Sequence, residues 1–189
     1  SILEAEKLAI YYVDNLPKFP DKSRAFVDKM PHNYQRIGYI LSAIPNAKIV
    51  NILRDPRDTA LSTWIQRFSA DGITHAYDWH AMAHSANLYR RYMNLWQSKF
   101  ESQILTIQYE HLTSAPETVM RQVVEHCGID WDPAMISPEQ NKGTVRTASI
   151  DQVRSKISSK SVGKWKLAED DLQPFLANLD NTLWPEYDL

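Results

Sequence analysis

The sequence predicts an α/β fold, a doubly wound parallel sheet flanked by helices. Short apolar runs of strand length alternate along the chain with longer stretches whose apolar residues recur at helical spacing. The connections between them are short, and a strand, a helix and a strand joined this closely form a parallel βαβ unit in nearly all proteins. At 189 residues the chain is long enough for one domain with a sizeable core.

The composition is that of an ordinary globular protein, with 43% hydrophobic and 23% charged residues and a formal net charge of −2. Lysine and arginine are scattered, which argues against a nucleic-acid or membrane-surface binder. The single cysteine, Cys127, allows no internal disulfide, so we expect a reducing, cytoplasmic location. We see no apolar run of membrane-spanning length and no signal peptide.

The first elements alternate between helix and strand. A helical pattern opens the chain and ends near Pro17, and residues 24–28 (RAFVD) predict a first strand. Residues 34–44 predict a helix that Pro45 stops. Residues 49–53 are mostly β-branched or aliphatic, as in a strand buried on both faces of a parallel sheet.

The chemistry changes where this second strand ends. Arg54 follows the strand, Asp55 is a natural N-cap and Pro56 suits the first position of a helix. Such a junction aims free backbone N–H groups and the positive end of the helix dipole at one place, and Arg54 adds a forked guanidinium. The pattern predicts an anion site. The alternative is a capped helix start in which these residues, with Arg57 and Asp58, form surface ion pairs.

Residues 78–100 predict a long helix and residues 103–109 a third strand. The helix carries His80 and His84 one turn apart, a spacing that suits zinc. No carboxylate completes a ligand set, so we interpret both as surface or capping histidines and predict no metal site.

Ser114 and Glu117 have the spacing of a capping box for a helix over residues 119–126, which Gly128 closes. Residues 130–161 then show little periodicity, which is typical of a binding loop or of disorder.

A tryptophan between two lysines in residues 161–166 indicates that the chain docks again on the fold. A last helix is expected over residues 169–179.

Polar side chains follow all three predicted strands: Lys29 the first, Arg54 the second and Tyr109 the third. The carboxyl ends of parallel strands share one edge of the sheet, and ligands bind there. The basic stretch with Ser149 and Lys164 would cover this edge. Two cations and a phenol favour an anionic ligand with a ring, and a nucleotide has both features.

Five segments, in this order and at this spacing, together resemble the sulfotransferases, and most of all the tyrosylprotein-sulfotransferase-like branch and its bacterial relatives. They are residues 28–33 (DKMPHN), residues 54–58 (RDPRD) with Ser62, residues 109–112 (YEHL), residues 149–153 (SIDQV) and residues 163–166 (GKWK). The resemblance implies a P-loop-like fold and the sulfuryl donor 3'-phosphoadenosine 5'-phosphosulfate (PAPS), with 3'-phosphoadenosine 5'-phosphate (PAP) as product.

The resemblance also implies roles for single residues. Arg54 and Ser62 would hold the 3'-phosphate, Tyr109 would contact the nucleotide, and a segment that includes Gln152 would wrap over it and bring Lys164 to a phosphate.

Catalysis would fall to Lys29 and Ser149, which match residues close to the transferred sulfuryl group. We expect them to stabilise charge on the leaving phosphate, by analogy with phosphoryl transfer.

Two parts of the family pattern have no counterpart in these 189 residues: the glycine- and threonine-rich loop that holds the 5'-phosphosulfate, and the glutamate base that follows it. We therefore expect residues 1–189 to form a single sulfotransferase domain that is N-terminally truncated. The alternatives are an inactive nucleotide-binding remnant, a partner-binding module, or a P-loop nucleotide kinase, whose Gly-Lys-Ser/Thr loop is missing from the sequence. The acceptor hydroxyl stays open among sugar, peptide tyrosine, lipid and small molecule, and the sequence fixes no oligomeric state.

Overall fold

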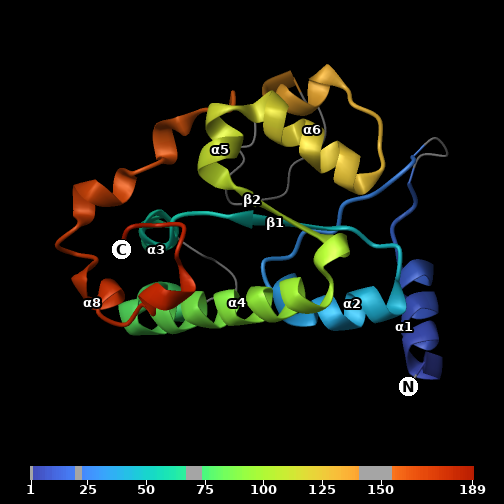
Figure 1. The fold of residues 1–189 in the computed structure, drawn as a ribbon, viewed down its shortest axis with the longest axis horizontal. Coiled ribbons are helices and arrows are strands. Elements are labelled where there is room, and N and C mark those ends of the chain that lie inside the picture. The colour runs from blue at the N-terminus through green and yellow to red at the C-terminus, as the bar shows by residue number, and fades with distance from the viewer. Residues whose placement is uncertain (1, 20–22, 67–73, 141–154) are drawn as a thin grey trace.

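The computed structural model describes residues 2–19, 23–66, 74–140 and 155–189. A small parallel sheet lies between two helical layers (Figure 1). The long helix α4 (Trp79–Lys99) runs along one side of the sheet, and α5 (Tyr109–Ser114) and α6 (Pro116–Cys127) lie on the other. The α/β class predicted from the sequence is what the described residues form.

The remaining regular elements are short. They are the helices α1 (Ile2–Asp14), α2 (Ile37–Ala43), α3 (Pro56–Ile65) and α8 (Gln173–Leu176) and the strands β1 (Ile49–Leu53) and β2 (Ile104–Gln108). Single 3-10 turns join several of them, among them η7 (Lys164–Ala168) close to the C-terminus. No helix in the described ranges has the length and apolarity needed to cross a membrane.

The two strands confirm the strand predicted over residues 49–53 and, one residue shorter at each end, the strand predicted over residues 103–109. The predicted burial of β1 on both faces is wrong, because Leu53 is its only buried residue and Ile52 is 52% exposed. The two strands pair in parallel with Ile49 opposite Ile104 and Leu53 opposite Gln108. Because the strands end at the same level, the residues that follow them, Arg54 and Tyr109, leave the sheet side by side. The register therefore sets the position of the site.

Two apolar clusters hold the layers together, one at each end of α4. The cluster at the carboxyl edge of the sheet comprises Leu53, Ala60, Met82, Ala83, Leu172, Phe175, Leu179 and Trp184. The other comprises Ile37, Leu41, Met93 and Ile104. Half of the first cluster comes from the C-terminal segment, and the end of the chain folds back over α3 and α4 (Figure 1).

The strand predicted over residues 24–28 is not formed, so the three-stranded prediction was wrong for the part of the chain that the structure describes. The segment has no regular structure, and Val27 is 90% exposed. A strand forms only where a neighbouring strand pairs with it, and this segment pairs with neither β1 nor β2. Side-chain contacts hold the segment instead: Tyr12 of α1 donates a hydrogen bond to Asp28, and Arg24 pairs with Asp130.

The predicted capping box is also wrong. Ser114 ends α5, and its hydroxyl donates to the carbonyl of His111 at 3.2 Å. Helix α6 begins at Pro116 without a side-chain cap, because proline already has the backbone angle of a first helical residue. Gly128 ends this helix in the left-handed conformation, with φ 65°, as predicted.

The helix predicted over residues 169–179 is regular only over the four residues of α8. Turns replace its first part, and Pro174 follows them in the first turn of α8, where it is tolerated.

Candidate anion site at the carboxyl edge of the sheet

The junction between β1 and α3 is capped as the sequence predicted. The Asp55 side chain accepts a hydrogen bond from the Arg57 backbone N–H at 2.9 Å and pairs with the Arg57 guanidinium at 2.8 Å. Both side chains are about nine-tenths buried, with 11% and 10% of their surfaces exposed. The alternative to the predicted anion site is a capped helix start with surface ion pairs. The ion pair between Asp55 and Arg57 exists, but it is buried and it stabilises the first turn of α3.

Arg54 occupies the position predicted for an anion ligand. Its guanidinium lies over the Tyr109 ring, 4.8 Å from the centroid, and its Nη2 donates to the Ser161 carbonyl at 2.8 Å. Its Nε is buried and has no hydrogen-bond partner among the described residues. A buried donor on a cation is costly to leave unpaired. A phosphate oxygen would satisfy it, so the residues present fit an anionic ligand.

The sequence predicted that Tyr109 ends the third strand. In the structure it is instead the first residue of α5. Its neighbour Glu110 joins the two strand ends, because one carboxylate oxygen accepts the Asp55 backbone N–H at 3.0 Å. The other oxygen accepts the hydroxyl of Tyr187 at 3.2 Å. Burial, and then the Glu110 charge, raises the pKa of Tyr187 above its ordinary value.

Asp58 anchors the C-terminal segment on α3. It is 2% exposed and accepts two backbone hydrogen bonds, from Gly163 at 2.7 Å and from Trp165 at 2.9 Å. The Trp165 ring lies under the Arg57 guanidinium, 3.9 Å from the centroid. The predicted docking of residues 161–166 is confirmed, and the backbone on both sides of Lys164 is fixed.

The structure brings some of the predicted site residues together and leaves others apart. Arg54 and Tyr109 are in contact. The side chains of Lys164, on the anchored turn, Ser62, on α3, and Lys29, in the segment before η1 (Asn33–Arg36), are exposed, and no described contact joins them to Arg54. Ser149 and Gln152, also predicted for the site, lie outside the described residues.

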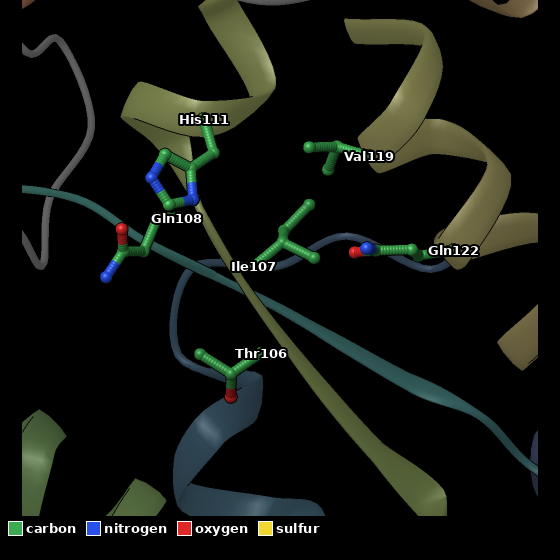
Figure 2. Close-up of a pocket in the computed structure, with 6 residues that line it drawn as sticks. All are labelled: Thr106, Ile107, Gln108, His111, Val119 and Gln122. Carbon is green, nitrogen blue, oxygen red and sulfur yellow. The ribbon is translucent and has the colours of Figure 1, made fainter. Parts of the chain in front are cut away.

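A pocket of about 280 Å³ lies beside β2. Figure 2 shows its lining: Thr106, Ile107 and Gln108 from the strand, His111 from α5, and Val119 and Gln122 from α6. Ile107 points toward Val119, and the amides of Gln108 and Gln122 and the imidazole of His111 add polar groups to the lining. One of the lining residues, Gln108, directly precedes Tyr109 in the chain.

Both His80 and His84 are exposed on α4. Within the described ranges, no cluster of three or more His, Cys, Asp or Glu side chains could hold a metal ion.

Sequence reasoning did not assign the parts played by Asp58 and Glu110. Both were visible as members of predicted motifs, and an acidic residue in the first turn of a helix is a common stabilising feature. Their partners, Gly163, Trp165 and Tyr187, lie more than 70 residues away in the chain. No local pattern indicates such pairings.

The fold and this junction define an α/β protein with an anion-compatible site at the carboxyl edge of its parallel sheet. Comparison with known proteins then gives the family. A model described as "Sulfotransferase family" matches residues 2–133, and the chain belongs to the sulfotransferase family.

The relatives that it matches are longer proteins. An uncharacterized protein of Aquifex aeolicus is 37% identical over 170 residues, which cover 89% of this chain and 22% of that protein. Protein-tyrosine sulfotransferase A of Caenorhabditis elegans is 26% identical over 77% of this chain and 40% of its own length. Protein-tyrosine sulfotransferase 2 of Gallus gallus is 22% identical over 87% of this chain and 46% of its own length. The chain thus spans less than half the length of these relatives.

Proposed function

We propose that this chain contributes the 3'-phosphate half of a PAPS site and that the protein transfers a sulfuryl group from PAPS to a hydroxyl acceptor. Membership of the sulfotransferase family supports the reaction class. The assignment of the donor depends on one observation: the buried Nε of Arg54 has no hydrogen-bond partner among the described residues. Its position between a helix N-terminus and an aromatic ring suits a phosphate next to a nucleoside.

The proposed division of labour follows the charges. Arg54 and Lys164 supply positive charge to the 3'-phosphate, and Ser62 adds a hydroxyl donor. Tyr109 contacts the nucleotide, and Gln152 belongs to the segment that covers it. Fixed cations of this kind bind the donor equally in the ground state and the transition state, so they act mainly on affinity.

Lys29 and Ser149 are proposed to act on the rate. Sulfuryl transfer places growing negative charge on the leaving phosphate, and donors aimed at that charge lower the barrier. An ammonium and a hydroxyl suit this role without a metal ion.

For the acceptor, peptide tyrosine is the first class to test, because several relatives carry the name protein-tyrosine sulfotransferase. Sugars, lipids and small phenols are the comparison classes. The pocket beside β2 is the proposed place for the acceptor, because one of its lining residues, Gln108, directly precedes Tyr109 in the chain.

The test has two parts. The chain is titrated calorimetrically with PAP and with 5'-AMP, which lacks the 3'-phosphate. We expect clear preference for PAP, and equal or no binding of both would refute the donor assignment. Labelled PAPS is then supplied with a tyrosine peptide, a sugar and a phenol. Preference for PAP without transfer to any acceptor would favour a nucleotide-binding remnant, and phosphate transfer from Mg·ATP would favour a kinase.

A further inference from the structure

Asp58 lies in the first turn of α3, four residues after Arg54, and is almost fully buried. Charged carboxylates are rarely buried unless they are paired or strongly hydrogen-bonded. Asp58 has no ion pair among the described residues, and its two oxygens are used separately. Oδ2 accepts the Gly163 N–H, and Oδ1 accepts the Trp165 N–H.

These two amides flank Lys164 on each side. The helix dipole of α3 and both N–H groups stabilise the buried charge, so the contact is a strong one. Gly163 makes it possible, because it turns the chain with φ 73°, a conformation that disfavours other residues. The same segment carries Ser161, whose carbonyl accepts a hydrogen bond from Arg54. The Asp58 carboxylate thus links α3 to a segment that contains one predicted phosphate ligand, Lys164, and contacts another, Arg54.

We propose that Asp58 is a positioning residue for the 3'-phosphate: it fixes the backbone around Lys164 and holds the Ser161 carbonyl against Arg54. This inference rests on the proposed function of the site. The Trp165 ring also packs on Arg57, but this contact involves the side chain and does not bond to the backbone around Lys164. The two hydrogen bonds of Asp58 hold that backbone directly.

An asparagine at this position tests the proposal through the two hydrogen bonds. The variant Asp58→Asn keeps the size of the side chain and one acceptor oxygen, but its NH₂ group meets the second backbone N–H, donor against donor. One of the two amides is then released. The matched control is Asp78→Asn, where an exposed carboxylate accepts the Ala81 N–H at 2.7 Å at the start of α4 and makes no described contact with residues 161–166.

The experiment measures the dissociation constants of PAP and 5'-AMP for the folded chain and both variants. Amide exchange is followed by NMR at Gly163 and Trp165. We expect Asp58→Asn to weaken PAP about tenfold, the scale of one charged hydrogen bond, while 5'-AMP changes little. Exchange should accelerate at one of the two amides in this variant, and Asp78→Asn should match the parent in all readouts.

Three outcomes would overturn the inference. If Asp58→Asn lowers stability but keeps the PAP preference of the parent, Asp58 is only structural. If both amides stay equally protected, Asp58 does not fix the segment. If the parent itself shows no PAP preference, the proposed function fails and the inference fails with it.

A second variant keeps the test decisive if Asp58→Asn does not fold. Gly163→Ala leaves Asp58 intact, and its added Cβ meets no atom within 4 Å, so it only strains the turn. We expect a smaller loss of PAP affinity in the same direction, and an unchanged PAP preference would contradict the proposal.

Discussion

Replacing Arg54 with methionine tests the centre of the proposed site. Methionine keeps much of the length of the side chain and removes the guanidinium. The described residues use that guanidinium for one hydrogen bond, to Ser161, and one ring contact, with Tyr109. In the parent protein, the buried Nε of Arg54 and the remaining N–H groups of the guanidinium are therefore available to a phosphate.

The magnitude follows from these contacts. A phosphate held by one or two charged hydrogen bonds gains about 2–4 kcal/mol from them, so Arg54→Met should weaken PAP by about thirty- to a thousandfold. The affinity for 5'-AMP should change by less than about threefold, because the contacted group is missing. Arg54→Lys should lie between, since lysine keeps the charge and loses the fork.

Calorimetric titration measures both affinities, and urea unfolding checks that each variant is folded under the titration conditions. Arg91→Met is the control, because Arg91 is 65% exposed and pairs with Asp180 on the surface. The reasoning is refuted if PAP affinity is unchanged in Arg54→Met. It is equally refuted if PAP and 5'-AMP weaken by the same factor, because Arg54 would then only support the fold.

Three further predictions concern turnover, packing and alkaline pH. Lys29→Ala should lower the rate of transfer from labelled PAPS by about a hundredfold and leave PAP affinity nearly unchanged; a pure loss of affinity would reassign Lys29. Arg90 is 7% exposed and pairs with Glu186 at 2.8 Å, so Arg90→Met should lower the urea unfolding free energy by about 3 kcal/mol, and Arg91→Met by at most about 0.5 kcal/mol. Equal losses would contradict the burial argument. The raised pKa of Tyr187 means that its stabilising effect is complete below its ordinary value of 10.0 and is lost as pH rises above it. Unfolding measured at about pH 8 and about pH 11 should show a smaller alkaline loss for Tyr187→Phe than for the parent, and equal losses would refute this assignment.

The strength of local patterns decided which elements could be predicted. The second and third predicted strands are formed because each is rich in β-branched and aliphatic residues, and each buries part of its side chains against the helices. The helix start at Pro56 and the helix end at Gly128 depend on the backbone preferences of single residues, and both are formed as predicted. The segment over residues 24–28 has strand-like residues too, but it does not pair with β1 or β2, and strand pairing is a property of the whole fold.

The sequence by itself determined that this is an α/β protein whose Arg54 ends a strand, precedes a capped helix and suits an anion, because those features are local. It also supplied the ordered motifs by which the chain resembles a sulfotransferase. Only the tertiary structure decided that Tyr109 lies under Arg54, that Glu110 joins the strand ends and that Asp58 anchors the turn at Lys164. These contacts join residues 55 to 107 positions apart, and their geometry depends on strand register and helix packing, which no short stretch of sequence encodes.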